Sequence, residues 1–126
     1  MRSKKPHWDL AVVKSLNAAG KLILTKTKAQ SSFTDAAAAM NAAKTLVDQL
    51  TDRQFAETLV QLDICDVYGV QFQGCGWYLK LTIDELLVVV SLHPLQWSLR
   101  TNGGIVAPPP TTANGREAKD KPDEMP

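Results

Sequence analysis

The stretch that decides the fold is GWYLKLTIDELLVVVSLHPL, residues 76–95. Apolar and polar residues alternate along residues 77–83, and a second apolar run at 86–92 follows Asp84 and Glu85. Successive side chains of a strand point to opposite faces of a sheet. The pattern therefore predicts an antiparallel hairpin that turns at Asp84 and Glu85.

The alternation also predicts which residues share each face of this hairpin. The apolar face is expected to hold Trp77, Leu79, Leu81, Ile83, Val88, Val90 and Leu92. The opposite face is expected to hold Tyr78, Lys80, Thr82, Val89, Ser91 and His93. Folding about the turn places Ser91 opposite Tyr78, with His93 farther along the ladder. A phenol, an amine, a hydroxyl and an imidazole on one face make a candidate catalytic or anion-binding surface, and an ordinary solvated sheet face is the alternative.

Two helices and a short strand are predicted before this hairpin. Asp9 is placed to cap the first helix, which ends before Gly20, and residues 21–27 alternate closely enough for a short strand. A second helix is expected from Thr34 to about Leu50. Its apolar residues recur at helical spacing.

A third helix is predicted to begin at Thr51, because Thr51 and Gln54 have the spacing of a capping box. Its core face would consist of Phe55, Leu59 and Leu62. Residues 66–72 then form a strand that leads through a glycine-rich turn into the hairpin. Three successive strands with short turns predict an α+β fold, in which an antiparallel sheet has its helices packed on one face.

Length and composition predict one folded domain and a tail. The 126 residues suffice for a single core over residues 1–102. Residues 103–126 are rich in Gly, Pro, Thr and charged residues and include a run of three prolines, so we expect a disordered tail there.

The net charge of +1 conceals an uneven distribution. Residues 1–30 contain seven basic residues and one acidic residue, whereas residues 31–101 contain four basic and eight acidic residues. A basic amino-terminal third, which includes Lys26 and Lys28, can bind phosphate groups. An ordinary solvated surface is the alternative.

Other sequence features narrow the class of protein. Two cysteines, both distant from the histidines in sequence, do not form a zinc motif, so free thiols and no metal or cofactor are expected. The basic amino terminus lacks the apolar run of a signal peptide, and no apolar run is long enough to span a bilayer. We expect a cytoplasmic protein without a membrane partner.

Several motifs of this chain resemble the MqsR family of toxins. The resemblance rests on PHWDLAVVKSLNAAG at residues 6–20, DVYGV at 66–70 and WYLKLTI at 77–83, followed by LLVVVSLHPL at 86–95. It implies a RelE-like α+β fold and the activity of a messenger-RNA interferase, a ribonuclease that cuts at short GCU-type sites. It also implies a zinc-containing antitoxin partner with a helix-turn-helix domain, through which the toxin would contact DNA only indirectly.

The resemblance also implies positions for the active site. The family's active-site tyrosine corresponds to Tyr78, and a family lysine near the end of the last strand corresponds to His93. A second family lysine corresponds to Glu57, which reverses the charge, and a glutamine before the DVY motif corresponds to Cys65.

These side chains match the needs of metal-free RNA cleavage. His93 suits an acid or base role, Glu57 is a candidate general base, and Tyr78 can donate a hydrogen bond to the phosphate or stack on a base. The remaining candidates for RNA binding are Lys80, Ser91, Lys26 and Lys28. Trp77 and Trp97 are expected to pack in the core and at an edge. An endoribonuclease toxin is the leading hypothesis, and a non-catalytic module that binds the antitoxin and modulates transcription of its operon is the alternative.

Overall fold

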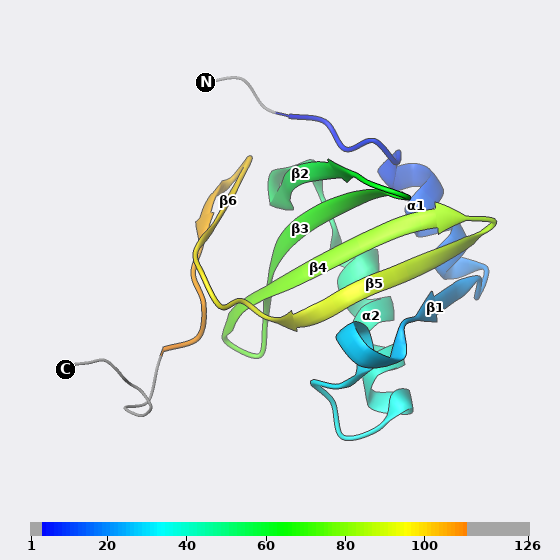
Figure 1. Ribbon diagram of the computed structural model, residues 1–126, viewed down its shortest axis with the longest axis horizontal. Coiled ribbons are helices and arrows are strands. Elements are labelled where there is room, and N and C mark those ends of the chain that lie inside the picture. The colour runs from blue at the N-terminus through cyan, green and yellow to red at the C-terminus, as the bar shows by residue number, and fades with distance from the viewer. Residues whose placement is uncertain (1–3, 111–126) are drawn as a thin grey trace.

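A five-stranded sheet forms the centre of the protein in the computed structural model, with both α-helices behind it in the view of Figure 1. The structure describes residues 4–110. The strand order is β1-β5-β4-β3-β2, in which β1 is parallel to β5 and every other neighbouring pair is antiparallel. The strands are β1 (Leu22–Leu24), β2 (Phe55–Val60), β3 (Ile64–Phe72), β4 (Cys75–Asp84) and β5 (Leu86–Pro94). The predicted α+β class, a mostly antiparallel sheet in a RelE-like arrangement, is confirmed.

The first helix, α1 (Leu10–Ala18), begins where the sequence predicts. A carboxylate oxygen of Asp9 accepts a hydrogen bond from the Ala11 amide at 2.9 Å, which satisfies one of the free N–H groups at the helix start. After the helix, Gly20 has φ = +76°, a left-handed conformation that favours glycine and reverses the chain into β1.

The second helix, α2 (Ala36–Gln49), is capped by Asp35 and not by Thr34 as predicted. A carboxylate oxygen of Asp35 accepts a hydrogen bond from the Ala38 amide at 2.8 Å. The predicted apolar face is confirmed, because its residues are all buried: Ala39, Ala43, Leu46, Val47 and Leu50.

The core lies between these helices and one face of the sheet. Its largest fully buried side chains are Tyr68, Phe55, Leu50, Leu79, Leu81, Leu87 and Leu92. We call the covered side the helix face and the opposite side the open face. Burying one face and leaving the other accessible is usual for an antiparallel sheet.

The predicted third helix is wrong. Thr51 and Gln54 do form the capping box, but it caps only a single 3-10 turn (Asp52–Gln54). The chain then continues as β2, which is antiparallel to β3. Leu62, expected in the helix core, is fully exposed in the β2–β3 connection. Pairing with β3 gives Phe55–Val60 backbone hydrogen bonds and therefore overrides the weak local preference for helix.

The strand predicted over residues 21–27 is shorter than expected. Only Leu22–Leu24 pair with β5, and a π-helical turn, Lys26–Gln30, follows. Ala29 of this turn is fully buried in the core, so the turn packs against the rest of the protein and ends the strand.

A second, small sheet follows β5. It consists of β6 (Leu99–Thr101) and β7 (Gly104–Val106), which form an antiparallel hairpin. Residues 104–106, which we expected in a disordered tail, are therefore part of a strand, because they pair with β6 and precede a hydrogen bond from the Gly76 amide to the Ala107 carbonyl at 3.1 Å. The rest of the predicted tail, residues 111–126, lies outside the described residues.

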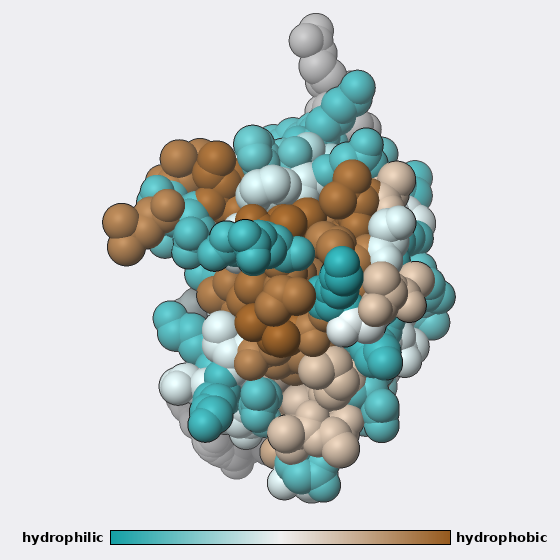
Figure 2. All heavy atoms as spheres, turned by 90° about the vertical axis from the view of Figure 1, so that its right-hand side faces the viewer, coloured by the Kyte–Doolittle hydropathy of each residue, from teal (hydrophilic) through white to brown (hydrophobic). Residues whose placement is uncertain are grey.

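The side of the molecule that carries α1, β1 and the β4–β5 turn has a large apolar surface (Figure 2). Exposed apolar side chains on these elements include Val12, Ile23 and Leu86. Ala11, Val12, Leu16 and Ala19 of this region also line a shallow hollow of about 510 Å³. This surface is separate from the polar residues of the open face.

Candidate functional site

Two β-bulges determine which side chains reach the open face. In the β2–β3 pair, Phe55 is opposite Tyr68 and Glu57 is opposite Val67, so Ala56 is an extra residue. Without it, Phe55 and Glu57 would point to the same face, because they are two residues apart. The bulge instead buries Phe55 in the core and turns Glu57 to the open face.

The second bulge lies in β5. Lys80 is opposite Ser91 and Leu81 is opposite Val89, so Val90 is the extra residue. The predicted faces of β5 are therefore wrong at Val88, which is opposite Thr82 on the open face, and at Val89, which is fully buried on the helix face. Since two residues of β5 oppose one of β4, Ser91 and His93 keep the open face while Val89 points to the core.

The bulge also corrects the predicted register. Tyr78 is opposite His93, and not Ser91 as predicted. The two rings stack at a centroid distance of 5.1 Å with an interplanar angle of 9°. Tyr78 and His93, which the sequence pattern placed at different points of the ladder, thus form one stacked pair.

The hydrogen bond of His93 fixes which ring nitrogen is available. Its Nδ1 lies 2.9 Å from the Pro94 carbonyl oxygen. A carbonyl only accepts hydrogen bonds, so this contact requires a proton on Nδ1. Nε2 is therefore the nitrogen that exchanges a proton with a substrate, because it accepts a proton in the neutral ring and donates one in the imidazolium.

A second row of side chains crosses the open face next to this pair. Cross-strand register places Glu57, Val67, Lys80 and Ser91 in one row. Glu57 is exposed and Lys80 is half-buried. Ser91, predicted to bind RNA, is only 2% exposed and offers a ligand little surface.

The charges of this row act on its neighbours. Burial, followed by the nearby charge of the Glu57 carboxylate, raises the pKa of Tyr78. Its phenol therefore keeps its proton at neutral pH and acts as a hydrogen-bond donor rather than as a base. Burial also raises the pKa of Cys65 despite the opposing effect of Lys80, so the thiol stays protonated.

A hollow of about 250 Å³ opens beside the Tyr78–His93 pair. Its other lining residues come from the segment between β5 and β6: Leu95, Gln96, Trp97, Ser98 and Leu99. Trp97 is 79% exposed, so the prediction that it packs at an edge is wrong. Trp77 is buried, as predicted.

Lys26 and Lys28 are not part of this cluster. Both are exposed on the π-helical turn after β1, and neither lines the hollow at Tyr78. The structure thus places Tyr78, His93, Glu57 and Lys80 on one face of the sheet, whereas the two lysines lie on a turn that packs beside β5, outside the hollow.

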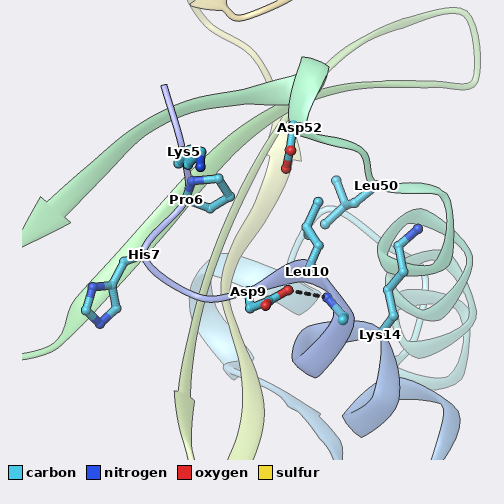
Figure 3. Close-up of a pocket in the computed structure, with 9 residues that line it drawn as sticks. Lys5, Pro6, His7, Asp9, Leu10, Lys14, Leu50 and Asp52 are labelled. Carbon is cyan, nitrogen blue, oxygen red and sulfur yellow. Dashed lines mark hydrogen bonds between the residues drawn. The ribbon is translucent and has the colours of Figure 1, made fainter. Parts of the chain in front are cut away.

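A larger hollow, of about 570 Å³, lies between the amino-terminal segment, α1 and the chain after α2 (Figure 3). The Asp9 carboxylate at its edge is engaged as the cap of α1, and His7 points away from Asp9 and Leu50 (Figure 3). This hollow is larger than the one beside Tyr78, but it is the weaker candidate for the functional site, because its polar groups do not converge on one point.

The segment at residues 7–8 is held by Asp66. This fully buried carboxylate accepts hydrogen bonds from the amides of His7 (3.0 Å) and Trp8 (2.8 Å) and from the Thr58 hydroxyl (2.6 Å). His7 thus anchors the amino-terminal segment through its backbone amide. Asp66 has no sequence signal for this role beyond its place in the DVY motif.

Within residues 4–110, no group of three or more His, Cys, Asp or Glu side chains is arranged to hold a metal ion. No helix in this part of the chain is long and apolar enough to cross a membrane.

A mostly antiparallel sheet, with helices on one face and titratable side chains on the other, defines a small α+β protein of the RelE-like class. A family described as "Motility quorum-sensing regulator, toxin of MqsA" matches residues 5–94. The chain therefore belongs to the MqsR toxin family and is a toxin of a toxin–antitoxin system, with an antitoxin as its partner. No curated protein matches the chain significantly.

Proposed function

We propose that this toxin is an endoribonuclease that cuts single-stranded messenger RNA on the open face of the sheet. The observation that carries the proposal is the stacking of His93 on Tyr78 beside a hollow, with Glu57 and Lys80 on the same face. These are the groups that transfer of an RNA phosphate needs when side chains supply the base, the acid and the positive charge.

In the proposed reaction, the ribose 2′-oxygen attacks the adjacent phosphorus as its proton passes to a base. The bond from phosphorus to the 5′-oxygen breaks, and an acid protonates that oxygen. The products are a 2′,3′-cyclic phosphate and a 5′-hydroxyl. Glu57 is the proposed base and His93 the proposed acid, with the exchanged assignment as the alternative.

Lys80 and Tyr78 stabilise the phosphate in this proposal. The Lys80 ammonium offsets the negative charge that builds up on the phosphate oxygens. Tyr78 donates a hydrogen bond, a role supported by its raised pKa. Lys26 and Lys28 would bind flanking phosphates outside the site, as exposed lysines commonly do.

Family resemblance supports the finer features of the proposal. We infer cleavage at GCU-type sites, action in the cytoplasm, and control by a zinc-binding antitoxin that contacts operator DNA through a helix-turn-helix domain. The second candidate function is a non-catalytic toxin that only binds its antitoxin. The reversed charge at Glu57 favours it, because a carboxylate repels the phosphate that a lysine would attract.

The test is RNA cleavage by purified protein, with chemical analysis of the product ends. Tyr78→Phe and His93→Ala should each slow cleavage by about a hundredfold or more, because each removes a proton donor or carrier from the reaction. Both variants should fold normally, since neither side chain is part of the core.

Lys21→Ala, which removes an exposed lysine remote from the site, is the matched control and should cleave at the rate of the unmodified protein. Equal rates for His93→Ala and the unmodified protein would remove His93 from the mechanism. Failure of the unmodified protein to cut any RNA, with intact antitoxin binding, would favour the non-catalytic function.

A further inference from the structure

The wall of the hollow at Tyr78 comes from outside the region that matches the family. The match ends at residue 94, and residues 95–99 line the hollow. Leu95 fixes the start of this wall, because it is 5% exposed and its amide donates a hydrogen bond to the Gly76 carbonyl at 3.0 Å. Leu99 fixes its end, because it begins β6. The three residues between these anchors, Gln96, Trp97 and Ser98, are exposed.

Docking of the β6–β7 hairpin holds this wall in place. A Cβ atom at Gly69 on the open face of β3 would lie 3.1 Å from side-chain carbons of Leu99 and Thr101 and 3.2 Å from one of Val106. The hairpin therefore packs closely on the backbone of β3 at Gly69, where a Cβ atom would force these side chains to shift. Such a support fixes the position of Trp97 relative to Tyr78.

Trp97 is unusual for its exposure. The indole is the largest apolar side chain, and on average it is highly buried in folded proteins. Here it is 79% exposed at the rim of a hollow that also contains the stacked rings of Tyr78 and His93. Three aromatic rings therefore surround one small space.

We propose that this hollow, with Trp97 as its stacking platform, is a subsite for one unpaired nucleobase of the RNA. Single-stranded RNA is commonly recognised by bases that stack on aromatic side chains and hydrogen-bond through their edges. Gln96 and Ser98, which flank Trp97, supply an amide and a hydroxyl that can meet a base edge. The inference rests on the proposed function, since it assigns a part of the same RNA to the same site.

The dimensions of the hollow favour a single base over a larger ligand. Its volume of about 250 Å³ is below the range of roughly 300–1,000 Å³ usual for drug-sized molecules. Its lining combines apolar Leu95 and Leu99 with aromatic rings, which suits a planar ring system. The base bound there would be a neighbour of the phosphate at Tyr78 and His93, so the subsite would influence which sequence is cut.

The experiment measures the affinity of the full-length protein for a 2′-O-methyl RNA oligonucleotide, which cannot be cut because its 2′-oxygens are blocked. Trp97→Ala should weaken binding by about tenfold, within the range measured for loss of one stacked base, and Trp97→Phe should retain most of the affinity. Ile105→Ala, which removes another exposed apolar side chain of the same region outside this hollow, is the control and should bind normally.

Oligonucleotides with a single abasic position separate stacking from a structural effect. At one position, removal of the base should weaken binding to the unmodified protein and have no further effect on Trp97→Ala. An equal penalty in both proteins at every position would overturn the subsite, and so would unchanged affinity of Trp97→Ala.

The outcome for the subsite is distinguishable from the outcome for the proposed function. Cleavage of RNA with no dependence of binding on Trp97 would overturn the subsite alone. Binding that depends on Trp97, without cleavage of any RNA, would overturn the nuclease and keep the subsite. Absence of all RNA binding would overturn both.

Discussion

The two faces of the central sheet each carry a carboxylate and a tyrosine, and the two pairs differ in burial. On the helix face, Asp66 and Tyr68 are both fully buried. On the open face, Glu57 is exposed and Tyr78 is half-buried. A carboxylate and a tyrosine thus contribute to the core where they are buried, and remain available to a ligand where they are exposed.

The largest difference in stability between variants of the two faces is expected when their carboxylates are removed. Asp66→Ala should lower the free energy of unfolding by about 3 kcal/mol or more, because three donors lose a buried, charged acceptor. For a domain of this size, that loss corresponds to a fall of about 10 °C or more in Tm. Thermal unfolding followed by circular dichroism measures it.

Glu57→Ala is the matched control on the open face and should change the free energy of unfolding by no more than about 0.5 kcal/mol. Two variants that melt at the same temperature would show that the faces do not differ in this way.

A smaller effect is expected from the hairpin that partly covers the open face. A chain that ends at Asn102 lacks β7 and the Ala107 carbonyl that accepts the Gly76 amide. Its free energy of unfolding should fall by about 2 kcal/mol or more, since the bonds from the Gly76 amide to Ala107 and from the Gly103 amide to Arg53 are lost with the β7 ladder, and each backbone hydrogen bond contributes about 1 kcal/mol. Denaturant titration measures the loss, and a chain that ends at Pro110 is the control. Equal stability of the two shortened chains would mean that β7 contributes nothing to the fold.

The smallest effect is expected from the two tyrosines. The Tyr68 hydroxyl is buried without a hydrogen-bond partner among the described residues. Tyr68→Phe should therefore leave the free energy of unfolding unchanged or raise it by up to about 1 kcal/mol. Tyr78→Phe should also be neutral for stability, but it should abolish most of the RNA cleavage. The two variants together test whether the Tyr68 hydroxyl is dispensable in the core while the Tyr78 hydroxyl is required for cleavage.

Alkaline pH sharpens the same comparison. Burial raises the pKa of Tyr68 and of Tyr78 in the folded protein. Below about pH 10 these tyrosines keep their protons in both the folded and the unfolded protein, so their ionisation does not lower the free energy of unfolding. Above that pH the unfolded state ionises first, so stability falls. Tyr68→Phe should remove more of this fall than Tyr78→Phe, because Tyr68 is the more deeply buried.

The hairpin and the two long helices were predictable because local patterns determine them. The alternation of residues 77–83, the turn at Asp84 and Glu85, and the cap at Asp9 all depend on neighbours in sequence. The region from Phe55 to Leu62 was not predictable in this way. Its apolar spacing fits a helix, and only pairing with β3, which lies beyond it in the sequence, makes it a strand.

The candidate site was predictable in its members and not in its geometry. Tyr78, His93 and Lys80 follow from the hairpin pattern, but the extra residues Ala56 and Val90 exist only relative to a partner strand. A bulge leaves no clear mark in the composition of one strand, so the stacking of His93 on Tyr78 required the structure. Exposure of Trp97 likewise depends on how the hairpin β6–β7 docks.

The contacts of Asn102 have a consequence for how this toxin is synthesised. Its side chain bonds the Lys4 amide and carbonyl at 2.8 and 2.7 Å and the Asp52 carbonyl at 2.7 Å, so it joins the two ends of the described chain. A growing polypeptide emerges from the ribosome amino terminus first, and pairings of such long sequence separation form last. A nascent chain cannot form these hydrogen bonds until Asn102 has been synthesised, after every strand of the central sheet. Premature termination after Pro94 and before Asn102 would therefore yield a protein that has the whole central sheet but lacks these hydrogen bonds.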